Sequence, residues 1–175
     1  MLKSQDVVLL LKLLANPSHL QWAQAQLAMH LCVSVSAINA GLKRLSSAGL
    51  VQLGQTGKLY QPVLTSCEEF LISGVKYIFP VKLGEFTSGI ETSYAAPILK
   101  NYIMSGGDPI PVWPYAEGKQ RGMSLEPLYP SVPKSVSLFS DPEFYDLLCL
   151  IDVLRQGRVR ERMYASKILK ERVNS

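Results

Sequence analysis

The sequence has few residues of the kinds that bind metals or form disulfide bonds. It contains only three cysteines, Cys32, Cys67 and Cys149, and they are far apart in its 175 residues. There is no CxxC motif, and the two histidines, His19 and His30, are not paired, so the sequence shows no metal-ligand cluster. We predict that each cysteine is a buried, reduced thiol, which is typical of cytoplasmic proteins. We expect the histidines to lie at the surface.

Long apolar runs are also absent. No stretch of about 18 consecutive apolar residues occurs, so we expect no membrane span. The first residues, 1–6, lack a signal-peptide pattern, because Asp6 interrupts the positive charge expected there. With 47% hydrophobic residues, the chain can build one core or two small ones. We therefore expect a globular, cytoplasmic protein.

Patterns of catalytic residues are missing as well. The sequence has no glycine-rich phosphate loop and no nucleophile with a recognisable base. Its closely spaced acids, Glu68–Glu69 and Asp141–Glu143, are explained as the acidic residues that favour the start of a helix. We therefore expect that the protein is not an enzyme and that it uses no cofactor and no metal.

Charge is distributed unevenly along the chain. Residues 1–62 carry five basic and one acidic side chain, residues 63–151 carry six and ten, and residues 152–175 carry seven and three. Basic ends around an acidic middle are expected if the ends contact phosphate and the middle does not. The net charge of +4 is modest for this length, so the pattern supports nucleic-acid binding only in combination with a motif.

Residues 21–61 show the pattern of two helices followed by a hairpin. A tight turn at Cys32–Val33 separates the helices, Ser34 is placed to cap the second one, and Gly49 is suited to end it. Apolar residues at helical spacing define the two buried faces: Leu27, Ala28 and Leu31, then Ile38, Leu42 and Leu45. Residues 50–53 and 58–61 alternate around a Gly-Gln-Thr-Gly turn, which predicts a β-hairpin. This combination is typical of a winged helix–turn–helix, whose second helix enters the DNA major groove.

The exposed polar residues of the second helix and the hairpin are the predicted DNA contacts. Residues near the start of that helix would meet base edges, and Asn39 can pair with adenine through two hydrogen bonds. Lys43, Arg44 and Lys58 are placed to bind phosphate. The alternative is that these side chains only solvate the surface. The full predicted set is Ser34, Ser36, Ala37, Asn39, Ala40, Lys43, Arg44, Gln55 and Lys58.

Helices are also predicted on both sides of this unit. Residues 4–15 form an amphipathic helix that Ser4 is placed to cap and that ends before Pro17. Thr65 and Glu68 match a capping box at the start of a helix that runs to about Phe79. We expect this helix to pack against the first one through Phe70, Leu71, Val75 and Ile78.

Residues 80–140 contain most of the prolines and show no sustained helical period. Aromatic residues are spread through the segment, which favours an ordered, loop-rich structure over a disordered tether. Residues 95–103 predict a short helix with a proline in its first turn, and residues 109–114 and 125–129 predict extended segments. The sequence assigns no strand pairing here.

The C-terminal residues 141–175 predict an α-hairpin. Asp141-Pro142-Glu143 is typical of a helix start, and Gly157 ends this helix. A second helix follows to about Val173, with Val159, Met163, Ile168 and Leu169 predicted to face inward. The first helix carries more apolar surface than one partner helix covers, which predicts a dimer contact at Leu147, Leu150, Ile151 and Leu154. The alternative is packing within one chain.

The segment 34–51, SVSAINAGLKRLSSAGLV, resembles the turn, recognition helix and start of the wing of MarR-type and related winged-helix transcriptional regulators. The winged-helix unit that contains this segment, residues 1–62, covers about a third of the chain, and the Gly-Leu-Val ending is shared by many winged-helix families. The rest departs from the MarR pattern, because one helix precedes the unit and a proline-rich segment follows it. Residues 152–162 resemble the C-terminal segments of small regulators found beside mobile-element and defence genes.

Together, these patterns predict a mainly α fold with a small β-wing. We expect a winged helix–turn–helix DNA-binding domain at residues 1–62, and a linker helix, a loop-rich middle and a helical hairpin at residues 63–175. The predicted function is a sequence-specific transcriptional regulator, a repressor that binds double-stranded DNA as a homodimer. The alternative is a winged-helix protein-interaction module in a larger complex, such as a defence or toxin–antitoxin system. The sequence indicates no particular small-molecule effector.

Overall fold

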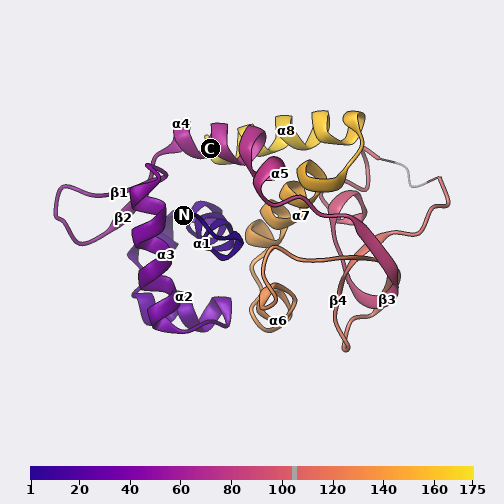
Figure 1. Ribbon diagram of the computed structural model, residues 1–175, viewed down its shortest axis with the longest axis horizontal. Coiled ribbons are helices and arrows are strands. Elements are labelled where there is room, and N and C mark those ends of the chain that lie inside the picture. Colours follow the sequence, from indigo (N-terminus) through magenta and orange to yellow (C-terminus); the bar gives the residue numbers. More distant parts are fainter. Residues whose placement is uncertain (104–105) are drawn as a thin grey trace.

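The structure is a computed structural model that describes residues 1–103 and 106–175, and in these residues the fold is mainly helical with two small sheets. Figure 1 shows the N-terminal helices and a protruding hairpin at one end and a small barrel at the other. Helix α7 (Pro142–Gln156) lies between them, and α4 (Leu64–Glu69), α5 (Val75–Ile78) and α8 (Val159–Val173) form a row along one side. The predicted mainly α class with a small β element is confirmed.

The N-terminal elements follow the predicted order. They are α1 (Ser4–Ala15), η1 (Pro17–Gln21), α2 (Gln24–Leu31), α3 (Val35–Ser47), β1 (Val51–Leu53) and β2 (Tyr60–Pro62). The expected cap of α1 is wrong: Ser4 lies inside the helix, and the Asp6 carboxylate instead accepts the backbone N–H of Lys3 at 2.8 Å. As expected, α1 ends before Pro17, where Asn16 is extended.

The linker helix begins earlier and packs elsewhere than predicted. The backbone N–H of Val63 donates to Leu50 O at 2.9 Å, and α4 starts directly after this contact, so Thr65 lies within the helix and caps nothing. The segment continues through a π-helical turn, η2 (Phe70–Gly74), into α5. Its buried line is Cys67, Leu71 and Val75, whereas Ile78 is exposed. The main contacts of this segment are with α7 and α8, and not with α1 as predicted.

The proline-rich middle forms a closed three-stranded barrel that the sequence did not predict. Its strands are β3 (Leu83–Glu91), β4 (Pro111–Pro114) and β5 (Gln120–Leu125). Strand β3 is antiparallel to both others, and β4 and β5 close the barrel as a parallel pair. The short helix expected at residues 95–103 is wrong: only η3 (Ser93–Ala95) and a series of turns are present. The expected extended segment 109–114 contains β4.

Close backbone approach explains the glycines of the barrel. A Cβ atom built on Gly89 would lie 1.9 Å from Trp113 O, and one on Gly122 would lie 2.0 Å from Ile110 O. No side chain fits at either distance. These glycines therefore allow the three strands to wrap tightly around each other.

The C-terminal hairpin packs within its own chain. Asp141 caps α7 as expected, accepting the N–H of Phe144 at 3.2 Å, and Gly157 ends the helix. The four residues expected at a dimer contact, Leu147, Leu150, Ile151 and Leu154, are all buried in the core. That prediction is wrong, because α1, α5, α8 and η3 of the same chain cover the apolar surface of α7. In α8 the buried residues include Leu169, whereas Val159 and Met163 are exposed, contrary to expectation.

One continuous hydrophobic core extends across the expected boundary at residue 62. It contains residues from α1, α2, α3, the linker helix, the barrel, α7 and α8. The thiols of Cys67 and Cys149 are buried in it, and burial raises the pKa of Cys67 to about 11, so this side chain stays a thiol. Cys32 is half-buried at the turn after α2.

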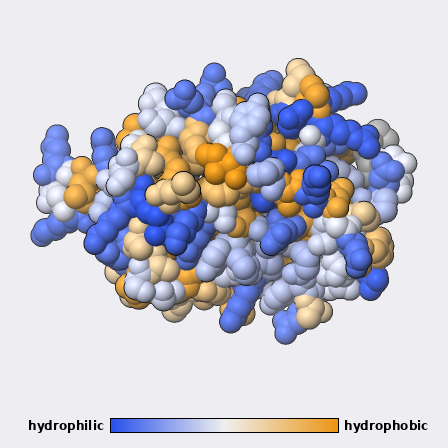
Figure 2. All heavy atoms as spheres, in the orientation of Figure 1, coloured by the Kyte–Doolittle hydropathy of each residue, from blue (hydrophilic) through white to orange (hydrophobic). Residues whose placement is uncertain are grey.

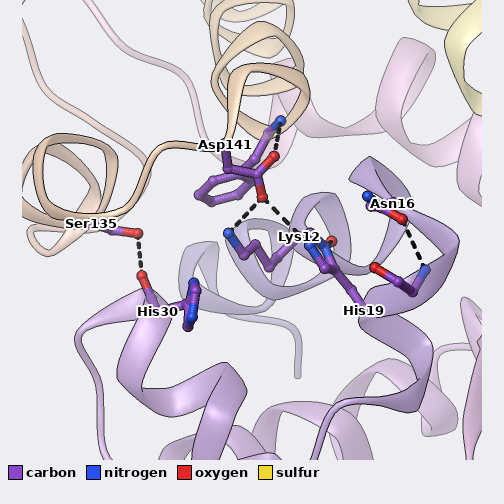
Figure 3. A network of polar contacts seen from close by, with 8 residues as sticks. Lys12, Asn16, His19, His30, Ser135 and Asp141 are labelled. Atoms are coloured by element: carbon purple, nitrogen blue, oxygen red, sulfur yellow. Dashed lines mark hydrogen bonds and ion pairs between the residues drawn. The ribbon is translucent and has the colours of Figure 1, made fainter.

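A polar cluster beside this core ties the N-terminal helices to α7 and to α6 (Val132–Leu138). Figure 3 shows Lys12 and His19 directed at Asp141, with Nζ of Lys12 2.7 Å from Oδ2 of Asp141. The hydroxyl of Ser135 on α6 donates to His30 O at 2.5 Å. The expectation of surface histidines is wrong for His19, which is buried and bonded through Nδ1 to Lys12 O at 2.7 Å.

A second polar cluster ties the barrel to α7. Asp152 is buried, and its Oδ2 accepts hydrogen bonds from Thr92 Oγ1 and Trp113 Nε1, both at 2.7 Å. Nη1 of Arg155 donates to the other oxygen at 2.9 Å. Burial raises the pKa of Asp152, and the contact with Arg155 opposes that rise.

In the described part of the chain, no single helix is long and apolar enough to cross a membrane. Within the described residues, α2 and α3 together have the length and apolar composition of a membrane span, but the two helices meet at an angle of 105°.

Candidate nucleic-acid interface

Helices α2 and α3 form a sharply bent pair whose geometry follows from local sequence signals. Cys32 adopts a left-handed conformation with φ of 56°, which ends α2. Ser34 Oγ then accepts the backbone N–H of Ala37 at 3.1 Å and caps α3, as predicted. The resulting angle of 105° between the helices lies within the range of about 90–120° seen in helix–turn–helix motifs.

The other end of α3 is closed by Gly49. Its φ of 78° lets the N–H of Leu50 reach Leu45 O at 3.0 Å, and its own N–H reaches Ser46 O at 3.0 Å. The chain therefore turns directly into β1. The predicted apolar faces are also confirmed, because all six of their residues are buried: Leu27, Ala28, Leu31, Ile38, Leu42 and Leu45.

The outward face of α3 is polar. Ser36, Asn39 and Lys43 are exposed, while Ala37 and Ala40 are half-buried. Asn39 Nδ2 donates to Gln24 Oε1 at 3.3 Å, so the first turn of α2 positions the amide expected to meet base edges. Gln24 is not among the residues predicted from the sequence, although its position ahead of the apolar face of α2 indicates that it faces outward.

Arg44 does not lie free on this face. Its Nε and Nη2 donate to the two oxygens of Asp6 at 2.7 and 2.8 Å, and the Asp6 side chain is fully buried. Donation of these hydrogen bonds to Asp6 raises the pKa of Arg44. The expectation that Arg44 anchors phosphate stays a prediction, and the structure adds that its Nε and Nη2 hold α3 against α1.

The hairpin carries the remaining predicted contacts. Strands β1 and β2 pair from Val51–Pro62 to Leu53–Tyr60, and the loop between them protrudes from the molecule. Gln55 and Lys58 are exposed on this loop, and Lys58 precedes β2 rather than lying in it. Figure 2 shows that the protruding hairpin, at the left of the view, is covered mainly by hydrophilic residues.

Two lysines are the cations available on these elements. Among the described residues, neither Lys43 nor Lys58 forms an ion pair, whereas Arg44 is bound to Asp6. Arg155, near the end of α7, is nearly buried, and its Nε donates to Phe79 O at 2.8 Å. Residues 1–103 and 106–175 contain no cluster of three or more potential metal ligands.

No protein-family model, curated protein or solved structure matches this chain. The candidate interface is therefore identified from the geometry of this chain alone.

Proposed function

We propose that this protein is a sequence-specific transcriptional regulator that binds double-stranded DNA through a winged helix–turn–helix, with β1 and β2 as the wing. The observation that carries the proposal is the exposed polar face of α3, held at 105° to α2 beside a protruding hairpin. That face carries a side-chain amide and an ammonium group, which are the kinds of groups that bind base edges and phosphates. Here Ser36, Asn39 and Lys43 are aligned there.

Two kinds of contact are expected. Asn39 would read a base edge in the major groove, where an Asn–adenine pair contributes about 1–3 kcal/mol of discrimination. Lys43 on α3 and Lys58 on the hairpin would bind phosphates, and each contact would release about one counterion from the DNA. Gln24 would hold the Asn39 amide in place before DNA binds.

The test begins with selection of preferred sequences from a random double-stranded DNA library with the full chain. Binding of the selected and a scrambled duplex is then measured by fluorescence anisotropy at several salt concentrations. Asn39→Ala should weaken binding to the selected duplex about tenfold more than binding to the scrambled one. An equal loss on both duplexes contradicts base reading by Asn39.

Salt dependence tests the phosphate contacts. Lys43→Ala and Lys58→Ala should each reduce the slope of log K against log salt by about one unit. Lys119→Ala is the matched control, because Lys119 is exposed in the loop between β4 and β5, and the barrel lies at the other end of the molecule from the hairpin (Figure 1). Unchanged slopes for both variants, or no binding to any duplex, overturn the proposal and leave a protein-interaction module as the remaining candidate.

We also propose that two copies act together as a repressor, because one winged helix contacts only a few base pairs and two-fold symmetry doubles the sequence it reads. The contact does not involve the buried leucines of α7. Light scattering at micromolar concentration, with and without the selected duplex, measures the stoichiometry. One chain on a duplex that carries two half-sites would contradict the dimer.

A further inference from the structure

A cleft of about 650 Å³ lies at the base of the hairpin, and no step of the proposed DNA binding uses it. Its walls come from α1, η1, β2, α4, α7 and α8, so elements from both ends of the chain meet there. We propose that this cleft binds a hydrophobic organic cation.

The walls are mainly aliphatic although the cleft is open to solvent. Leu14 and Leu20 are half-buried, and Leu64 keeps 44% of its surface exposed. Exposed leucines that face a common hollow lose contact with water when a ligand covers them, which favours binding of apolar molecules. The volume also lies within the range of about 300–1,000 Å³ that is typical of small-molecule sites.

Two charged side chains line the cleft, and they determine whether it favours a positively or a negatively charged ligand. Arg172 is already paired, with its Nη1 3.5 Å from Oδ2 of Asp146. Glu143 forms no ion pair within the described residues, and its side chain is exposed. The cleft therefore offers one carboxylate that has no ion-pair partner among the described residues, beside an apolar wall. A cation with an apolar body complements both features.

The cleft is placed to influence the hairpin. Gln61 and Pro62, the last residues of β2, form part of its wall, and Pro62 pairs with Val51 in β1. A ligand wedged between β2 and α7 would change where the hairpin sits relative to α3. This second step rests on the proposed DNA binding, whereas ligand binding itself does not.

The experiment compares two ions of nearly identical size and shape, tetraphenylphosphonium and tetraphenylborate, by isothermal titration calorimetry with the full chain. The phosphonium should bind saturably, and more tightly than the borate. Glu143→Gln should weaken phosphonium binding about fivefold, the value of one charge pair of about 1 kcal/mol in water. Glu85→Gln, an exposed acid on the barrel strand β3, should have no effect.

A second variant tests the location independently of charge. Leu64→Trp puts a larger side chain into the opening and should weaken binding of the phosphonium at least about tenfold, while the melting temperature shows that the fold is retained. Equal affinity for both ions, or unchanged binding by both Glu143→Gln and Leu64→Trp, overturns the proposed site.

The regulatory step is tested with the selected DNA duplex. Saturating phosphonium should shift the Kd for DNA by about threefold or more in the parent chain and not in Leu64→Trp, which controls for direct effects of the cation on DNA. If phosphonium still binds but the Kd for DNA does not change, the proposed effect of the ligand on DNA binding is wrong, whereas the ligand site itself stands. If the chain binds no DNA at all, the proposed function fails, and calorimetry still decides whether the cleft binds cations.

Discussion

Arg44 on α3 and Asp6 on α1 form a two-point ion pair, with N–O distances of 2.7 and 2.8 Å, across 38 residues of sequence. Asp6 also accepts the N–H of Lys3, so one buried carboxylate both caps α1 and holds α3 in position. The orientation of the proposed recognition helix thus depends on a contact in the protein interior.

Loss of this pair should destabilise the fold. Arg44→Ala leaves the Asp6 carboxylate buried without its charged partner, and we expect the free energy of unfolding to fall by about 2–3 kcal/mol, because Arg44 itself keeps some exposure. Lys43→Ala, the neighbouring exposed cation, should change it by less than about 0.5 kcal/mol. Urea denaturation followed by circular dichroism measures both. Similar values for the two variants would show that the pair contributes little.

The hydroxyl of Thr92 should contribute more to the free energy of unfolding than its methyl group does. Thr92→Val is nearly isosteric but removes a donor from the buried Asp152, so we expect a loss of about 1–3 kcal/mol in unfolding free energy. Thr87→Val on β3 is the control, since its hydroxyl makes only a 3.4 Å contact with Ser88 O. The same denaturation experiment applies, and equal losses would contradict a special role for the Asp152 cluster.

Two glycines of β3 should differ sharply in their tolerance of alanine. The added Cβ of Gly89→Ala meets Trp113 O at 1.9 Å, so the strands must separate, at a cost of about 3 kcal/mol. The nearest atom to the Cβ of Gly84→Ala is at 3.6 Å, an ordinary contact, and that variant should be neutral within about 0.5 kcal/mol. Thermal unfolding of both variants decides whether the barrel is as tightly closed as the distances indicate.

Stability should fall as the pH drops, partly through His30. Burial lowers the pKa of His30 below its ordinary value of 6.5, and the positive Lys12 adds to this, while Asp141 opposes it. The ring centroid of His30 lies 4.3 Å from that of Phe139 and 4.5 Å from that of Trp22.

A lowered pKa in the folded state means that the stability contribution of His30 is present above pH 6.5 and is lost as the pH falls through the folded value. The difference in unfolding free energy between about pH 7 and about pH 5 should therefore be smaller in His30→Gln than in the parent chain. The comparison uses this difference and not the absolute stability, because the variant also loses ring stacking. An unchanged pH dependence would exclude His30 as a contributor.

The helices in the N-terminal and C-terminal parts of the chain were predictable, because the residues that begin and end a helix act on their immediate neighbours. Ser34 and Asp141 cap their helices through atoms only three residues away, and Gly49 ends α3 through its own conformation. Apolar spacing also identified the buried faces of α2 and α3, since one helix determines its own periodicity. The polar residues of the proposed interface follow from the same pattern, because they lie on the face of α3 opposite its apolar residues.

Contacts between distant segments were decided only by the tertiary structure. The barrel joins residues 83–91 to residues 111–125 through pairings that no local period encodes. The apolar excess on α7 was visible in the sequence, but not that the same chain would cover it. Likewise, Arg44 was recognisable as basic, while its partner Asp6 lies far away in sequence. Local geometry depends on neighbouring residues, whereas the choice of partner depends on which surfaces the whole chain brings together.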